Sequence, residues 1–336
     1  MKRENPRLST ALLLGLFGNV LLCSQTAYWT RIGLLLLPAS CLVLSGVAAA
    51  FAVAWRQVGD NRLLRWGWLL ILIVSSALEL LRMWRLVDTV YPDSLRLLGV
   101  CIMLLAPVIY LRRVSSIAQT ANVVLAFLLA AGCVMVLSIA SDLHVANLQT
   151  PSLSTENICD ALRGQLVLYP ELLLPALWPE HDECAPRTAV RLAGGGLAFS
   201  VGVHLVLELF FGAGMPTHAN PVHAAAQSGT LSLFARLEWL QLVLWSMIVT
   251  IKLAIYLYAG IRLLGGRTCK GENNAVGLDR FPFYFVLILL TCMVFRQTNL
   301  AAFWQVRNLA MAGFACIVLL KGGIRWLFKN STLESS

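Results

Sequence analysis

Apolar stretches of about 20 residues follow one another along almost the whole chain, separated by short clusters of basic residues. Each stretch is long enough to cross about 30 Å of hydrocarbon as a helix. Hydrophobic residues make up 58% of the chain and charged residues only 13%, a composition that excludes an ordinary soluble domain. We therefore predict an all-α polytopic membrane protein with about ten transmembrane helices. The predicted spans lie near residues 9–29, 33–55, 66–87, 95–111, 118–140, 161–178, 190–213, 235–264, 281–297 and 301–327.

The basic residues favour one orientation of these spans. Most of the 26 Lys and Arg residues fall in alternate loops, while the segments 141–160 and 214–231 contain none. Because cytoplasmic loops collect Lys and Arg, we expect both termini to be cytoplasmic. The net charge of +9 thus reads as a topology signal, and no nucleic-acid partner is expected. The prediction is a single integral membrane domain, 1–336: repeat one at about 9–140, an outer loop 141–160, repeat two at about 161–327 and a short cytoplasmic tail 328–336.

Two spans carry residues that interrupt helices. In the sixth span, Tyr169, Pro170 and Glu171 predict an unwound midpoint, because proline removes a backbone donor and clashes with the preceding turn. In the first span, Gly15, Gly18 and Asn19 predict a corresponding interruption. Paired broken helices are typical of transport sites, where freed backbone groups face a ligand. The alternatives are an ordinary proline kink at Pro170 and, at the glycines, close packing of a neighbouring helix.

The eighth span buries a lysine, Lys252, close to its middle. A Lys at the centre of a membrane helix costs roughly 2.5–3.5 kcal/mol, so it needs a partner, water or a function. Its partner could be Glu79 or Glu171 across the bundle, or the ammonium could occupy the position of a coupling cation. A snorkelling or structural lysine is the remaining alternative. Glu79 could also be neutralised within its own helix by Arg82, one turn further on.

Other chemistry has little support in the sequence. We find no nucleotide-binding loop, no plausible nucleophile with a base and no acidic metal cluster. The cysteines show no metal or disulfide spacing. No enzyme activity, cofactor or metal is therefore expected.

The motifs from about 146 to 290 resemble the spore germination permeases, the B subunits of nutrient germinant receptors. The segment YPELLLPALWPE is similar to the family's sixth span, Ala146-Asn147-Leu148 followed by Pro151 is similar to its outer loop, and RFPFYFVLILL is similar to its ninth span. The most extensive match runs from Asn220 through the eighth span. Its matching residues are Pro221, Val222, Arg236, Leu237, Glu238, Trp245, Lys252, Tyr256 and Tyr258.

This resemblance implies a fold and a site. The family belongs to the amino acid, polyamine and organocation transporter superfamily, which has a LeuT-like, five-plus-five inverted repeat with broken helices 1 and 6. The resemblance implies a ligand pocket among spans one, three, six and eight. The ligand-binding residues expected there are Gly15, Gly18, Asn19, Glu79, Tyr169, Pro170, Glu171 and Trp245. The coupling or structural charges expected are Lys252, Arg236 and Glu238.

The resemblance also implies partners and a location. A small germinant, usually an amino acid, would bind, and an A subunit and a lipoprotein C subunit would join the chain in the inner membrane of the spore. Three functions stay open: a ligand-sensing receptor subunit, a secondary transporter of an amino acid with a coupling cation, and a structural scaffold. In the transporter, Lys252 could stand in for a sodium ion.

Overall fold

The computed structural model describes residues 8–22, 30–92, 96–111, 113–148, 154–177, 185–212, 220–229, 238–265 and 281–334. Within these ranges the chain is helical and contains no strand. Six helices are long and apolar enough to cross a membrane, and three shorter ones are also apolar. The prediction of an all-helical chain of membrane-protein type is confirmed. The helices are α1 (Leu8–Leu22), α2 (Thr30–Val58), α3 (Arg62–Val90), α4 (Leu97–Leu105), α5 (Val114–Ser138), α6 (Thr155–Gln165), α7 (Pro170–Leu173), α8 (Ala185–Phe211), α9 (Pro221–Ser228), α10 (Glu238–Gly265), α11 (Phe281–Phe295) and α12 (Leu300–Glu334).

Several boundaries differ from the predicted ones. The fourth predicted span ends early, because Pro107 follows α4 and begins a short 3₁₀ turn. The outer loop 141–160 is shorter than predicted, since α6 already begins at Thr155. The hydroxyl of Ser154 accepts a hydrogen bond from the backbone N–H of Asn157 and so caps the start of α6. At the other end of the chain, α12 continues to Glu334, through most of the predicted tail.

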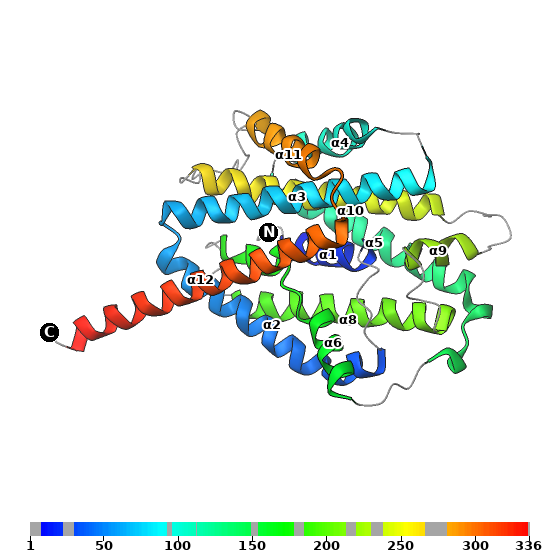
Figure 1. Ribbon diagram of the computed structural model, residues 1–336, viewed down its shortest axis with the longest axis horizontal. Coiled ribbons are helices and arrows are strands. Elements are labelled where there is room, and N and C mark those ends of the chain that lie inside the picture. The colour runs from blue at the N-terminus through cyan, green and yellow to red at the C-terminus, as the bar shows by residue number, and fades with distance from the viewer. Residues whose placement is uncertain are drawn as a thin grey trace, which may run out of the picture.

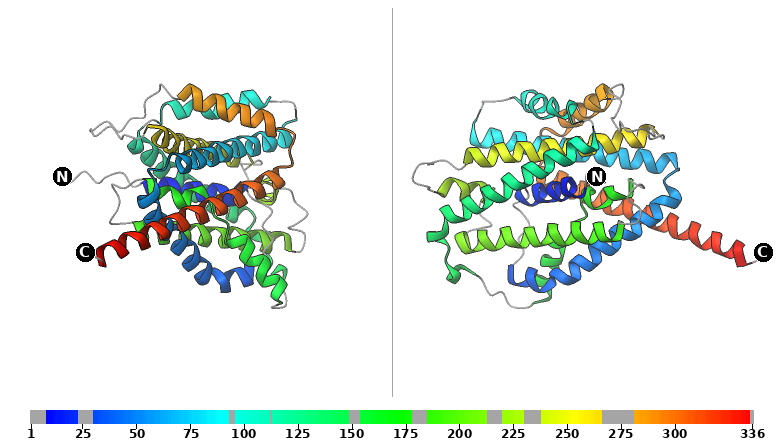
Figure 2. Two further views of the ribbon diagram at one scale, coloured as in Figure 1. Left: turned by 60° about the vertical axis from the view of Figure 1, so that its left-hand side comes forward. Right: turned by 180° about the vertical axis from the view of Figure 1, so that it is seen from behind.

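The two most buried long helices, α3 and α10, lie side by side at the centre of the bundle (Figure 1). On one side they are covered by α4 and α11, and on the other side lie α1, α2 and α8, as the reverse view also shows (Figure 2). The short helix α1 is enclosed, because it packs against α5, α7, α8 and α10. The C-terminal part of α12 extends beyond the other helices (Figure 1).

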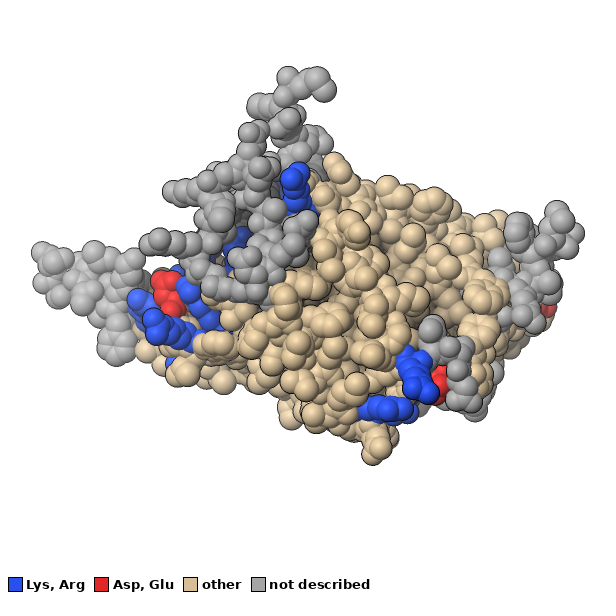
Figure 3. Space-filling model, turned by 90° about the horizontal axis from the view of Figure 1, so that it is seen from above, with Lys and Arg blue, Asp and Glu red and all other residues tan. Residues whose placement is uncertain are grey.

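The outward faces of the surrounding helices are apolar. Leu35 and Leu42 on α2, Val294 on α11 and Leu309 on α12 are each more than two-thirds exposed. On the face shown in Figure 3, the visible charged side chains leave a broad uncharged area between them. Exposed apolar surface of this extent marks an interaction with lipid or protein, and it fits helices that lie in a membrane.

An aromatic cluster joins three of the long helices, α2, α3 and α12. The Trp68 ring of α3 is fully buried and makes edge contacts with Phe51 and Trp55 of α2, at 5.1 and 4.6 Å between ring centroids. Phe314 of α12 completes the cluster, 5.9 Å from Trp68. Packing is the main attraction between helices in lipid, so these rings hold α2, α3 and α12 together.

Two adjacent glycines on α12 test this packing. A Cβ added at Gly322 would lie 2.6 Å from the Cβ of Ala54 and 2.8 Å from its Cα, whereas a Cβ added at Gly323 meets nothing within 4 Å. Gly322→Ala is therefore expected to destabilise the protein by about 1–3 kcal/mol through overpacking. Gly323→Ala should leave its stability unchanged or raise it by up to about 1 kcal/mol. Unfolding of both variants in mixed micelles measures the difference, and equal stabilities would contradict the tight contact of α12 with α2.

Candidate functional site

The sixth predicted span is broken, as expected. Helix α6 ends at Gln165, residues 166–169 are not helical, and α7 begins at Pro170. Proline is suited to the first position of a helix, and it forces the preceding residue, Tyr169, into the extended conformation seen here (φ −88°, ψ 146°). The end of α6 is fixed to α2, because the Gln165 amide donates to the Gly33 carbonyl and accepts from the Ser40 hydroxyl, each at 2.7 Å.

The break directs Glu171 into the centre of the bundle. Its side chain is fully buried, and three groups surround the carboxylate. The Tyr256 hydroxyl donates to Oε1 at 2.6 Å, and the Asn19 amide donates to Oε2 at 3.2 Å. The Lys252 ammonium lies 3.3 Å from Oε1. A buried carboxylate must be paired and hydrogen-bonded, and Glu171 is both.

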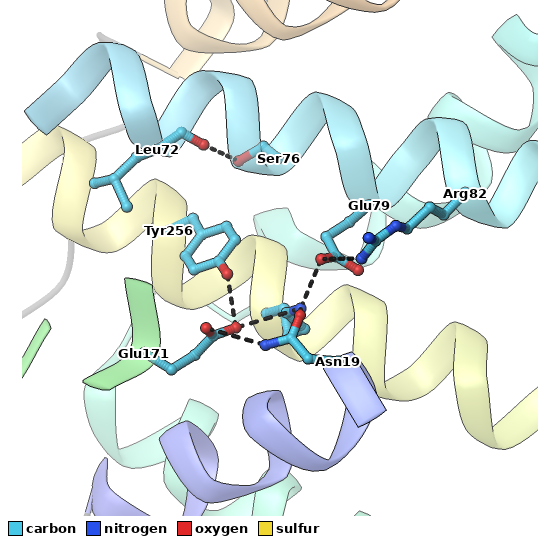
Figure 4. Close-up of polar contacts among 8 residues, drawn as sticks. Asn19, Leu72, Ser76, Glu79, Arg82, Glu171 and Tyr256 are labelled. Carbon is cyan, nitrogen blue, oxygen red and sulfur yellow. Dashed lines mark hydrogen bonds and ion pairs between the residues drawn. The ribbon is translucent and has the colours of Figure 1, made fainter. Parts of the chain in front are cut away.

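Lys252 connects this carboxylate to a second one. Its Nζ donates to Oδ1 of Asn19 at 2.6 Å and to Oε1 of Glu79 at 2.7 Å. We call Asn19, Glu79, Glu171, Lys252 and Tyr256 the central network (Figure 4). It joins α1, α3, α7 and α10. Of the alternatives open for Lys252, pairing with Glu79 or Glu171 across the bundle is confirmed, and it pairs with both. Snorkelling is excluded because the side chain is fully buried.

Arg82 extends the central network along α3. Its Nη1 lies 3.7 Å from Oε1 of Glu79, so the pair expected within this helix is present, although it shares the carboxylate with Lys252. The Arg82 guanidinium also lies over the Trp304 ring of α12, 6.0 Å from its centroid. A buried pair of this kind does not by itself stabilise a fold, because desolvation offsets the attraction, but removal of one partner is costly.

The expected interruption of the first helix at Gly15, Gly18 and Asn19 is wrong. Within the described residues α1 is continuous from Leu8 to Leu22. The glycines instead permit close approach: a Cβ at Gly15 would lie 3.0 Å from Cγ of Glu171, and one at Gly18 would lie 2.5 Å from Cγ2 of Ile248. Small residues let helices in membranes approach one another, and here they bring α1 against α7 and α10. This was the alternative left open for the two glycines.

Two cavities are lined in part by predicted site residues, Tyr169 in one and Trp245 in the other. The smaller, about 40 Å³, is at the break and is lined by residues that include Gly164, Val167 and Tyr169. Space of this size holds little more than water. The larger, about 670 Å³, lies among α5, α8, α9 and α10 and is almost entirely apolar. Trp245 lines the larger cavity, so the structure separates it from the other predicted ligand-binding residues.

Two of the predicted charges cannot be placed. Arg236 and the side chain of Glu238 lie outside the described residues, although Glu238 begins α10. Conversely, two site residues were missed. Tyr256 was named only as part of the motif match, yet its spacing of four residues from Lys252 places both on one face of α10. Arg307 is the second residue. A lone arginine in an apolar span marks a candidate site, and this feature is visible in the sequence.

The tyrosine of the central network provides a stability prediction. Tyr256→Phe removes the 2.6 Å hydrogen bond to Glu171, and hydrogen bonds to charged groups contribute about 1.5–3 kcal/mol, so we expect a loss of that size. Tyr284→Phe is the matched control on α11. It removes a 3.4 Å hydrogen bond from the Tyr284 hydroxyl to the Tyr256 carbonyl, and a neutral bond is worth only about 0.5–1.5 kcal/mol. The free energy of unfolding is measured for both variants. A loss of stability in Tyr256→Phe no larger than that in Tyr284→Phe would contradict the hydrogen bond from Tyr256 to Glu171.

The arrangement as a whole is a buried, charged centre next to a helix break, enclosed by helices that fit a membrane. Such a centre can hold a polar ligand or a cation where lipid alone would exclude it. A search of known protein families and of curated proteins finds no match to this chain. The resemblance to the spore germination permeases therefore depends on the sequence motifs alone.

Proposed function

We propose that this chain is a membrane protein that binds a small polar molecule, an amino acid, beside the break between α6 and α7, and that it acts as the B subunit of a nutrient germinant receptor. The observation that carries the binding proposal is the central network itself. Five polar side chains from four helices meet there, each no more than 2% exposed. Intramembrane charges that meet at an unwound segment are typical of ligand and ion sites. The germinant-receptor part follows from the motif resemblance.

We further propose the five-plus-five inverted repeat with ten crossings. The six long helices, the three shorter apolar ones and the broken α6–α7 pair add up to ten. If the second half begins at α6, its helices α7, α8 and α10 correspond to α1, α2 and α3, and each lies against its counterpart. The contact of α5 with α10 also corresponds to that of α12 with α3. Packing of this kind supports two halves related by a pseudo-two-fold axis. As part of the same proposal, both termini lie on the cytoplasmic side of the membrane.

Ligand binding requires the site to change shape. The cavity at the break is only about 40 Å³, so an amino acid can enter only if α6–α7 and the central network rearrange. The ligand would then shift the protein between two states, which partner subunits could read. The A subunit and the lipoprotein C subunit are the partners proposed from the resemblance.

Secondary transport of an amino acid is the alternative function. One observation favours it: the Lys252 ammonium is held by Glu79, Glu171 and Asn19, an arrangement of oxygen acceptors that could also hold a coupling cation. In that case movement of the lysine would accompany movement of the solute across the membrane.

Binding of single radiolabelled amino acids to the purified chain in nanodiscs tests the proposal. At least one should bind, and Glu171→Gln should weaken it by about tenfold or more, since a charged partner is lost. Glu156→Gln, on the exposed face of α6, is the matched control and should bind like the wild type. No binding by the wild type, or equal binding by Glu171→Gln, would contradict the proposed site. Uptake of the same amino acid into proteoliposomes would favour the transporter over the receptor.

A further inference from the structure

Arg307 of α12 is a further buried cation near the central network, and part of its guanidinium has no hydrogen-bond acceptor among the described residues. The residue is only 3% exposed. Among the described residues, no acceptor lies within hydrogen-bonding distance of its Nε or Nη2. A guanidinium carries five N–H donors and is always charged, so it is almost never buried unless it is paired. In the described part of the chain, two nitrogens of this buried arginine are therefore left without an acceptor.

The position of Arg307 connects it to the helix break. Its guanidinium lies over the ring of Tyr169, 5.5 Å from the centroid, and Tyr169 also lines the small cavity at the break. Trp304, one turn earlier on α12, is the ring that contacts Arg82. Arg307 thus contacts the unwound segment through Tyr169, and Trp304 of the same helix contacts Arg82 of the Glu79–Arg82 pair. The face of Tyr169 attracts the positive charge, but it does not satisfy the in-plane N–H donors.

The charges of the described site do not balance without a further anion. Glu79 and Glu171 are compensated by Lys252 and Arg82. Arg307 then adds one positive charge that no described carboxylate pairs with. In addition, Oε2 of Glu79 has no hydrogen-bond donor among the described residues. The site therefore lacks one anionic acceptor and one donor.

We propose that the Arg307 guanidinium binds the carboxylate of the small molecule that enters at the α6–α7 break. The proposal rests on the proposed function and deepens it by naming the ligand class: an α-amino acid with a free carboxylate. Arginine binds a carboxylate through two parallel hydrogen bonds, a geometry that lysine cannot reproduce. The free oxygen of Glu79 is the acceptor available for the ligand ammonium. Because α1 is continuous, this side chain replaces the backbone groups that a break in the first helix would have supplied.

The test compares amino acids with their amides in thermal unfolding of the full chain in nanodiscs. The probes are glycine, L-alanine and L-leucine, each beside the amide in which a neutral group replaces the carboxylate. A ligand that binds the folded state raises the unfolding temperature. We expect at least one amino acid, and none of the amides, to stabilise the wild type. In Arg307→Gln, affinity for that amino acid should fall roughly 10- to 100-fold.

Two further variants separate ligand binding from folding. Lys321→Gln removes one positive charge from an exposed position of the same helix and should respond like the wild type. Arg307→Lys keeps the charge and should fold even if Arg307→Gln does not, with affinity weakened because the paired hydrogen bonds are lost. Without ligand, Arg307→Gln should unfold at or above the wild-type temperature, since it removes an unpaired buried charge. A drop in that temperature, with amino-acid affinity intact, would identify a structural arginine and overturn the proposal.

A second set of probes, formate, acetate and chloride, distinguishes this inference from the proposed function. Stabilisation of the wild type by these anions, lost in Arg307→Gln, would support an anion site even if no amino acid binds. Binding of an amino acid with the same affinity by wild type and Arg307→Gln would overturn the inference and leave the proposed function standing. If neither set of probes raises the unfolding temperature of the wild type, both the inference and the proposed function are contradicted.

Discussion

Replacement of Lys252 by Met is expected to destabilise the folded protein by about 3–5 kcal/mol. The change removes the cation that lies 2.7 Å from Glu79 and 3.3 Å from Glu171. Glu171 would then keep only the hydroxyl of Tyr256 and the amide of Asn19, with no cation. Glu79 would keep only Arg82, at the longer distance of 3.7 Å. The loss comes from these uncompensated charges rather than from the volume of the side chain, which methionine approximately fills.

Equilibrium unfolding in mixed micelles measures this effect. Lys321→Met is the matched control, because Lys321 is exposed on α12, and its effect should stay within about 0.5 kcal/mol. A Lys252→Met variant as stable as the control would mean that Lys252 is not the charge that joins α10 to α3 and α7.

The second large effect is expected at the aromatic cluster. Trp68→Ala should cost on the order of 3 kcal/mol or more, because Trp68 is fully buried between Phe51, Trp55 and Phe314, and the surrounding helices cannot collapse into the space. In lipid the loss consists mainly of packing contacts, since hydrocarbon chains do not drive helices together as water does. The same cluster holds α12 on α2 and α3, so Arg307 should lose its position as well.

Trp66→Ala provides the control for this prediction. Trp66 lies two residues away on the same helix but is 56% exposed, so its removal should change stability by about 0.5 kcal/mol or less. Both variants can be compared by the same unfolding measurement. Similar losses at the two positions would show that Trp68 does not hold the three helices together.

Some of the site could be predicted because single residues imposed a strong local constraint. Pro170 predicts the break of the sixth span, since proline can begin a helix but cannot continue one without losing a hydrogen bond. Lys252 predicts acidic partners, because a charge in the middle of an apolar helix must be paired or hydrated. Each prediction follows from the chemistry of a single residue and its own helix, and the structure confirms both.

Other parts could not be predicted, because they depend on which helices meet. Gly15 and Gly18 are compatible with a break or with close packing, and only the positions of Glu171 and Ile248 decide for packing. Tyr256 has the same local pattern as an interface tyrosine until Glu171 is placed beside it. Trp245 matched the motif, yet the tertiary arrangement puts it in the large apolar cavity.

The central claim is that one buried network joins the broken helix to the rest of the bundle. A double-mutant cycle between Glu171→Gln and Lys252→Met tests it most directly, with the free energy of unfolding measured for the wild type, both single variants and the double variant. Because the two side chains share one ion pair, we predict a coupling energy of at least about 1 kcal/mol, with the double variant less destabilised than the sum of the single ones. Additivity within about 0.5 kcal/mol would contradict the network.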